Sequence, residues 1–342
     1  MKALSLHRSA LRHLAVGLAF LFAPIATLAA EIVDAAYVAA ALARGAIAWD
    51  VRDAKAYADG HLPGAVNVGD VAVVLRDPNR EDWVPTAQVQ AILGRAGIDV
   101  LNREVILYSR TGDVFPHWVQ SGLRDFGAKA SHVFHGGMDA WQAAGFSVSK
   151  EPVTLPPVQL TLRTANTELI GTAEMLDRLK GGRLQLIDAR TPKEFSGDDV
   201  RAIRGGHIPG AVNLPYEANW VDPEAATKLA AKQTTSRAGM SLKPAEELRQ
   251  VYANLDRDKE VVVYCQSGVR ASVTVSVLRD LGFKDVKLYE PSWLGYAATL
   301  SAPAEREVFV NVGALNGRIA GLQSKLGELE AELAQVRKGA AK

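Results

Sequence analysis

The fold is decided by the stretch Val261-Val262-Val263-Tyr264-Cys265-Gln266-Ser267-Gly268-Val269-Arg270. Its first four residues form an apolar, mostly β-branched run, which is typical of a buried parallel strand. From Ala271 to Leu281 apolar residues recur at helical spacing, and Gly282 follows where such a helix would end. Because a strand, a short loop and a helix in this order are the repeating unit of α/β proteins, the sequence predicts an α/β fold.

Four motifs around this stretch occur twice in the chain, in the same order. The pairs are Asp50-Val51-Arg52 with Asp188-Ala189-Arg190, His61–Asn67 with His207–Asn213, Val105–Ser109 with Val261–Cys265, and Leu123–Gly127 with Leu278–Gly282. An ordered set of repeats predicts two copies of one domain. The second copy carries two insertions, around residues 196–203 and 225–241.

The repeats and the composition between them set the expected domain boundaries. We expect copy one at residues 31–150, a proline-containing linker at 151–165 and copy two at 166–302. Residues 303–342 remain as a C-terminal tail. In this tail apolar residues alternate in steps of four and three, at Leu315, Ile319, Leu322, Leu326, Leu329, Leu333 and Val336.

This heptad spacing predicts a helix over residues 315–336. The helix would either pair with other chains as a coiled coil, which would make the protein a homo-oligomer, or pack against its own domain. The sequence leaves both arrangements open.

The first thirty residues differ in kind from the rest. Lys2, Arg8 and Arg12 precede a short apolar stretch from Leu14 to Phe22, and small residues surround Ala30. This pattern is typical of a cleaved secretory signal peptide, with an uncleaved membrane anchor as the alternative. We therefore expect an exported protein, which would be periplasmic in a Gram-negative bacterium.

Composition excludes several classes of function. The 342-residue chain has 39 basic and 38 acidic residues, so it lacks the basic excess of a nucleic-acid binder. Its single cysteine, Cys265, indicates a reactive thiol or an intermolecular bond, and it leaves no resolving thiol within the chain for dithiol redox chemistry. No metal or organic cofactor is expected.

The loop that begins at Cys265 is suited to holding an anion. A tight turn into a helix lets main-chain N–H groups converge, and here the turn comprises Gln266, Ser267, Gly268 and Val269. Arg270 adds a permanent positive charge. These groups favour the Cys265 thiolate, and they would also bind a small anionic substrate.

Taken together, the motifs Asp-x-Arg, His-Ile-Pro-Gly-Ala-Val-Asn and Cys-x-x-Gly-x-Arg resemble the rhodanese superfamily over residues 35–300. The resemblance implies two rhodanese-like domains, each a small parallel sheet flanked by helices. It is closest to the tandem thiosulfate and 3-mercaptopyruvate sulfurtransferases, in which the C-terminal copy is active. Copy one has Ser109 where copy two has Cys265, so we expect copy one to be inactive.

The resemblance also suggests a substrate class. The six-residue loop from Cys265 to Arg270 resembles that of the sulfur-handling branch, whereas related phosphatases have a loop one residue longer. Mercaptopyruvate enzymes place an Asp and a His beside the residue that matches Ser267. Here Asp82 can be matched, but Trp83 stands where that His would fall, and the loop ends in Arg270 in place of the usual Thr.

These departures favour thiosulfate as the sulfur donor. We expect a sulfurtransferase that moves sulfane sulfur to a thiophilic acceptor through a Cys265 persulfide. The alternatives are 3-mercaptopyruvate sulfurtransferase activity, a non-catalytic persulfide carrier and a phosphatase-like hydrolase.

Two further sets of residues have open or structural roles. Arg190 matches an arginine that binds the anionic substrate in tandem sulfurtransferases, but it equally suits an internal brace with Asp188. His61 and His207 occur in both copies, including the copy without a thiol, so we interpret them as structural.

Overall fold

The computed structural model describes residues 30–165, 167–182 and 184–340. The predicted signal peptide therefore lies outside the described residues, except for Ala30. Within the described part of the chain, every helix is too short or too polar to cross a lipid bilayer.

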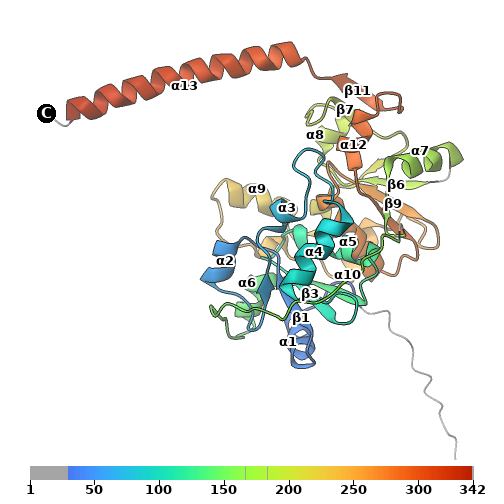
Figure 1. Cartoon of the computed structure of the whole chain (residues 1–342). Coiled ribbons are helices and arrows are strands. Elements are labelled where there is room, and N and C mark those ends of the chain that lie inside the picture. Colours follow the sequence, from blue (N-terminus) through green and yellow to red (C-terminus); the bar gives the residue numbers. More distant parts are fainter. Residues whose placement is uncertain (1–29, 166, 183, 341–342) are drawn as a thin grey trace, which may run out of the picture. The chain divides into compact units, whose positions relative to one another are not determined.

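Copy one is built on a four-stranded parallel sheet with the strand order β2-β1-β3-β4 (Figure 1). Its strands are β1 (Ile47–Asp50), β2 (Val66–Asn67), β3 (Glu104–Tyr108) and β4 (Ala130–Phe134). Its helices are α1 (Ala35–Ala43), α2 (Ala54–Asp59), α3 (Val71–Val74), α4 (Thr86–Ala96), α5 (Phe115–Asp125) and α6 (Gly137–Ala143).

Copy two is built on a five-stranded parallel sheet with the order β5-β10-β9-β6-β8. Its strands are β5 (Leu169–Ile170), β6 (Gln185–Asp188), β8 (Val212–Asn213), β9 (Val261–Tyr264) and β10 (Val286–Tyr289). Its α-helices are α7 (Thr172–Gly181), α8 (Pro192–Ser196), α9 (Ala225–Ala230), α10 (Ala245–Val251), α11 (Val269–Asp280) and α12 (Ser292–Ala298). Two short 3₁₀ helices are η1 (Tyr216–Asn219) and η2 (Ala238–Met240), and β7 (Arg204–His207) pairs antiparallel with β11 (Glu305–Phe309). The predicted α/β fold class is confirmed.

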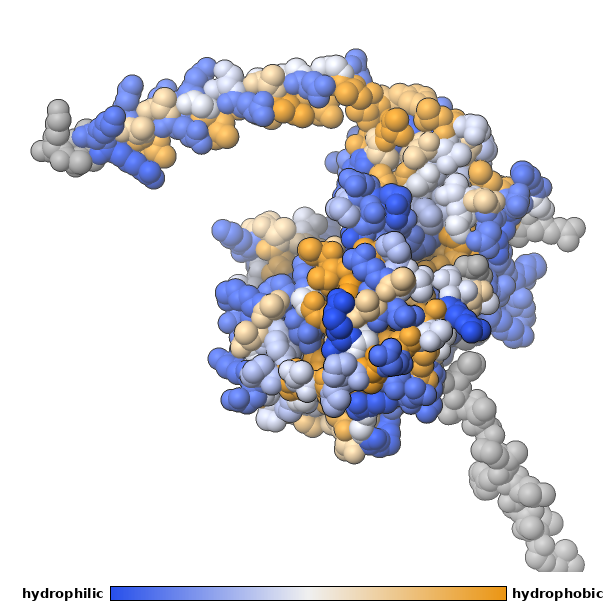
Figure 2. Space-filling model, viewed as in Figure 1, coloured by the Kyte–Doolittle hydropathy of each residue, from blue (hydrophilic) through white to orange (hydrophobic). Residues whose placement is uncertain are grey.

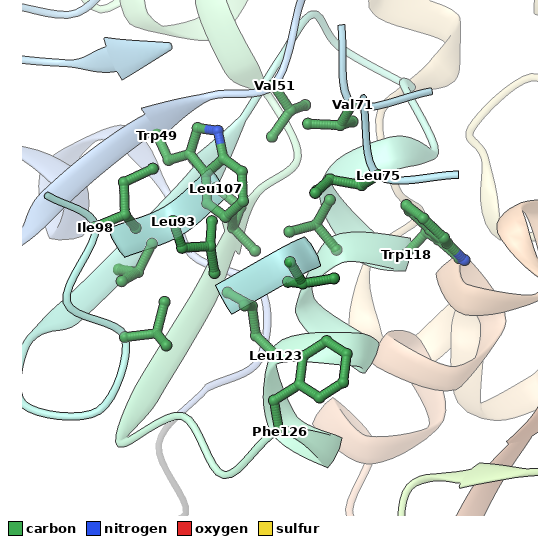
Figure 3. Packing of buried hydrophobic residues seen from close by; sticks show 14 of the residues in the cluster. Trp49, Val51, Val71, Leu75, Leu93, Ile98, Leu107, Trp118, Leu123 and Phe126 are labelled. Atoms are coloured by element: carbon green, nitrogen blue, oxygen red, sulfur yellow. The ribbon is translucent and has the colours of Figure 1, made fainter. Parts of the chain in front are cut away.

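Both faces of each sheet are covered, and this explains the continuous apolar runs in the sequence. In β3, Leu107 faces one hydrophobic cluster with Trp49 and Leu123 (Figure 3). Ile106, the residue before it, belongs to another cluster on the opposite face. In β9 the side chains of Val261 and Val263 likewise pack on the face opposite to that of Val262 and Tyr264. Side chains alternate across a strand, so a strand between two covered faces must be apolar throughout.

The repeated Asp-x-Arg motif is a buried brace in both copies. Arg52 donates to Asp50 and to the carbonyl of Gly60 (2.7 Å). Arg190 makes the matching bonds to Asp188 (2.6 Å) and to the carbonyl of Gly206 (2.7 Å).

The repeated histidines are also bound internally. The Nδ1 atoms of His61 and His207 lie 2.8 Å from the carbonyl oxygens of Tyr57 and Phe195, and each imidazole stacks on the ring of the same residue. These contacts agree with the structural role expected for both histidines.

The repeated Leu-Arg-Asp motif joins the two copies. Asp280 of copy two accepts hydrogen bonds from the main-chain N–H groups of Glu31 (2.5 Å) and Ile32 (3.1 Å) at the start of copy one. Asp125 of copy one accepts from the N–H groups of Thr167, Glu168 and Leu169 at the start of copy two (3.1–3.4 Å). Each copy thus binds main-chain N–H groups at the start of the other.

The tail begins with β11, and after it forms one long helix, α13 (Val312–Ala340), as the heptad spacing predicts. All described side chains of α13 are exposed, so the structure does not show this helix packed on its own domain.

We expect Asp125→Ala to lower the free energy of unfolding by about 3 kcal/mol, because three main-chain N–H groups lose their acceptor. Urea denaturation followed by tryptophan fluorescence measures this change. The matched control is Asp177→Ala, whose carboxylate is exposed on α7 and pairs only with Lys180. Equal stability of the two variants would contradict the assigned role of Asp125.

Candidate active site

The Cys265 loop lies where β9 ends and α11 begins. Cys265 follows Tyr264 directly, its side chain is buried, and α11 starts four residues later at Val269. Gly268 adopts φ +81°, and a Cβ at this position would lie 2.9 Å from the main-chain oxygen of Glu290. Only glycine meets both conditions without strain, so Gly268 allows the tight turn.

Several N–H groups of this loop are free to bind a ligand. Within the described residues, the main-chain N–H groups of Gln266, Ser267, Val269 and Arg270 have no hydrogen-bond acceptor. They precede or begin α11, a helix of 12 residues whose N-terminal dipole favours negative charge. The loop therefore has the main-chain donors that an anion-binding turn requires, with Cys265 at its start.

Ser292 holds the loop in this conformation. Its hydroxyl accepts hydrogen bonds from the N–H groups of Cys265 (3.1 Å) and Gly268 (2.9 Å), and donates to the carbonyl of Tyr289 (2.8 Å). Ser292 adopts φ +50°, a conformation that costs a non-glycine residue energy. The equivalent residue of copy one is Gly137, which also adopts φ +50°. Glycine adopts this conformation without strain, so only the copy with the thiol has a strained residue at this position.

Arg270 forms an ion pair with a buried acid, Glu194. Arg270 donates to both carboxylate oxygens of Glu194 (2.7 and 2.8 Å), and Arg201 donates to the same carboxylate (3.2 Å). Burial alone would raise the pKa of Glu194, but the hydrogen bonds and charge of Arg270 outweigh it and lower the pKa to about 2. Two arginines and one carboxylate leave a net charge of +1 beside the loop.

Arg201 was not found from the sequence. It lies in the 196–203 insertion, its side chain is 52% exposed, and its carbonyl accepts a hydrogen bond from the side chain of Gln266 (2.8 Å). The sequence feature that could have pointed to Arg201 is the cluster of charged residues in this insertion, which only copy two carries.

Of the two roles that the sequence left open for Arg190, the contacts of its side chain favour the internal brace. Arg190 is 1% exposed, and its guanidinium donates to the carboxylate of Asp188 and to the carbonyl of Gly206. Its Cζ lies 4.8 Å from the centroid of the Trp293 ring. Arg52 makes the same polar contacts in the copy without a thiol. Arg190 is thus a brace, because its guanidinium is already bound inside the protein and is closed to solvent.

The side chains of Trp293 and Val269 lie in the core. Trp293 is 1% exposed and donates from its indole to the carbonyl of Arg204 (3.0 Å). The side chain of Val269 packs in a hydrophobic cluster formed mainly by copy one. Of Val269, only the main-chain N–H is left as a ligand group.

Copy one contributes polar side chains at Ser267. Arg76 donates to the Ser267 hydroxyl (3.0 Å) and also binds Glu81, which contacts the same hydroxyl. Asp82 pairs with Arg80, and Trp83 stacks on Trp118 with ring centroids 4.2 Å apart. Among the described residues, no Asp–His pair contacts Ser267, so the arrangement expected of a mercaptopyruvate enzyme is not formed.

The corresponding loop of copy one lacks the thiol, and it has no arginine at the position of Arg270; its one cation, Arg110, is exposed and matches Gln266. Asp113 and Val114 stand where copy two has Val269 and Arg270, and the Ser109 hydroxyl donates to Asp113 (2.5 Å). The 225–241 insertion of copy two closes this loop, because a Cβ at Gly112 would lie 2.3 Å from the Cβ of Met240. A carboxylate in a covered loop opposes anion binding.

We expect Ser292→Gly to reduce kcat/KM for the sulfur donor about ten-fold to a hundred-fold, because the Cys265 and Gly268 N–H groups lose their acceptor. Steady-state kinetics gives the value. Gly137→Ala is no fair comparison because a Cβ there would clash with Ser109. The suitable control is Ser301→Gly, a change of the same kind at an exposed residue. An unchanged kcat/KM in Ser292→Gly would contradict the positioning role.

Glu290, beside Gly268, gives a pH prediction. The residue is 8% exposed, and burial together with the charge of Asp82 raises its pKa from 4.5 to about 8. Between these values the folded state binds a proton that the unfolded state has released, so the free energy of unfolding falls as pH rises from 4.5 to 8. The largest slope from this one group is about 1.4 kcal/mol per pH unit.

We expect Glu290→Gln to flatten this slope, whereas Glu246→Gln, at an exposed residue of α10, leaves it unchanged. Urea titrations at pH 5.5, 6.5 and 7.5 measure it. An identical slope in both variants would show that Glu290 is ionised throughout.

Comparison with known proteins agrees with these features. The rhodanese-like domain family matches residues 34–144 and 172–299, one match to each copy. The thiosulfate sulfurtransferase of Corynebacterium glutamicum is 34% identical over 270 residues, which cover 74% of this chain and 82% of the relative. A relative from Mycolicibacterium smegmatis is 32% identical over 264 residues, covering 74% of this chain and 88% of its own.

Solved structures share the fold. An anaerobic ergothioneine biosynthesis enzyme from Chlorobium limicola superimposes with a TM-score of 0.65 at 18% identity, covering 81% of this chain and 70% of that one. With a matching domain in each copy and relatives above 30% identity, this chain belongs to the rhodanese family and is a sulfurtransferase.

Proposed function

We propose that the enzyme takes sulfane sulfur from thiosulfate and passes it to a thiophilic acceptor through a persulfide on Cys265. The observation that carries this proposal is the set of unpaired N–H groups at Gln266, Ser267, Val269 and Arg270, which follow the only thiol of the chain. A doubly charged anion matches these donors and the net positive charge of Arg270, Arg201 and Glu194. The name of the Corynebacterium glutamicum relative supports thiosulfate as the donor.

The reaction is a double displacement. The Cys265 thiolate attacks the outer sulfur of thiosulfate, a new S–S bond forms, and the S–S bond of thiosulfate breaks with its electron pair leaving on sulfite. The loop N–H groups hold the negative charge of the resulting persulfide. An acceptor such as cyanide or a thiolate then attacks the outer sulfur and releases the Cys265 thiolate.

The alternatives differ from this proposal in the contacts of Ser267 or in the expected rate of turnover. The contact of Ser267 with Arg76, in place of an Asp–His pair, favours thiosulfate over 3-mercaptopyruvate. A persulfide carrier would use the same loop, and it differs in turning over slowly with small acceptors. We also propose that the chain is exported, on the strength of residues 1–30 alone.

We expect Cys265→Ser to lose thiosulfate:cyanide sulfurtransferase activity by about 1,000-fold or more, because a hydroxyl cannot form a persulfide. A cyanide-dependent thiocyanate assay measures turnover, and intact-mass spectrometry shows whether one sulfur atom is added. The matched control places a thiol in copy one: Cys265→Ser with Ser109→Cys should remain inactive, because Asp113 and Val114 oppose anion binding there.

The outcomes separate the candidates. Turnover and a sulfur adduct in the wild type alone support the proposal. A stable adduct without turnover identifies a carrier. No adduct from thiosulfate, but one from 3-mercaptopyruvate, identifies the other donor and contradicts the proposal.

A further inference from the structure

One side of α13 is a continuous row of apolar side chains, which we call the seam. Its members are Val312, Leu315, Ile319, Leu322, Leu326, Leu329, Leu333 and Val336, and each is 44–67% exposed. Figure 2 shows hydrophobic residues following the length of this helix beside hydrophilic ones. Leucines in such a row lose contact with water only when a second surface covers them, so the seam requires a partner.

The sequence of α13 contains several glycines that lower the stability of an isolated helix. Glycines occur at 313, 317, 321 and 327, and nothing lies within 4 Å of a Cβ built at Gly317, Gly321 or Gly327. Glycine in a helix interior is destabilising relative to alanine. None of the four lies on the seam, so the residues that a partner would cover are all good core residues, while the weak positions face solvent.

We propose that two copies of this chain associate through residues 312–336 as a parallel, in-register, two-stranded coiled coil. The seam divides into two heptad positions. Position a holds Val312, Ile319, Leu326 and Leu333, and position d holds Leu315, Leu322, Leu329 and Val336. Val and Ile at a with Leu at d, as in the first half of the seam, favour two parallel strands.

The charges beside the seam fit a second copy. The residue directly before each position a is position g of the heptad. In a parallel pair, a g residue of one protomer faces the e residue of its partner, which lies five places later in the sequence. Lys325 therefore faces Glu330, and Glu332 faces Arg337; the two-fold symmetry repeats both pairs. Arg318 faces Gln323, which is uncharged, so no two like charges face each other in the parallel pair.

Other occupants fit less well. In an antiparallel pair with full overlap, Leu322 of one protomer packs against Leu326 of its partner. Arg318 then meets Glu332 twice, but Lys325 meets Lys325. This arrangement therefore has two favourable charge pairs and one unfavourable pair, against four favourable pairs in the parallel dimer. A membrane surface would favour an excess of basic residues, whereas residues 312–338 carry Arg318, Lys325, Arg337 and Lys338 against Glu328, Glu330 and Glu332.

The test uses the full chain and sedimentation velocity over a range of concentrations. We expect wild type to sediment as a dimer, and Leu322→Glu to sediment as a monomer. Glu330→Lys places Lys325 opposite a lysine twice per dimer and should weaken association about ten-fold. The double variant Lys325→Glu with Glu330→Lys restores opposite charges and should restore the dimer, and Glu328→Lys, away from the seam, is the control.

Each contrary result overturns the proposal. A monomeric wild type, a trimer or tetramer, or a dimer that survives Leu322→Glu excludes the two-stranded coil. Failure of the double charge exchange to restore the dimer excludes the parallel arrangement. Binding of a monomeric wild type to vesicles of phosphatidylcholine and phosphatidylglycerol would assign the seam to membranes. The sulfurtransferase activity of each variant is measured alongside and should be unchanged, so this proposal and the Cys265 mechanism can fail independently.

Discussion

The turn from β9 into α11 must keep its N–H groups free for a ligand while its own ends are fixed. Main-chain donors that are buried and unpaired cost free energy, so a folded protein retains them only where the surroundings hold them in place. Here Ser292 binds the N–H groups of Cys265 and Gly268, and the N–H of Trp293 binds the carbonyl of Cys265 (3.0 Å). The loop is fixed at these three points, and the donors between them stay open.

Duplication gives this loop its surroundings. Residues 76–81 of copy one reach Ser267, and the 225–241 insertion of copy two packs on the loop of copy one. Asp125 and Asp280 each bind main-chain N–H groups at the start of the other copy. Copy one thus contributes contacts to the Cys265 loop although it has Ser109 in place of a thiol.

Local patterns in the sequence were sufficient to predict the fold and the position of the loop. The apolar run 261–264, the helical spacing of 271–281 and the repeats are all properties of neighbouring residues, and each predicted element is present. The heptad spacing likewise predicted α13. The structural role of His61 and His207 followed from their presence in both copies.

What the sequence could not supply were contacts between residues far apart in the chain. Glu194 is 76 residues from Arg270, so its neutralising effect had no local signal. Ser292 supports the loop from 27 residues away, and its strained φ becomes meaningful only beside Gly137. The sequence left the role of Arg190 open for the same reason, because the burial of its side chain depends on contacts with Gly206 and Trp293.

The most direct measurement is a crystal structure of the protein after treatment with thiosulfate. If Cys265 carries the sulfur, the map will show one added sulfur atom on its Sγ, within hydrogen-bonding distance of N–H groups of the 266–270 loop. An unmodified Sγ, or thiosulfate bound elsewhere while Cys265 stays free, would contradict the persulfide mechanism.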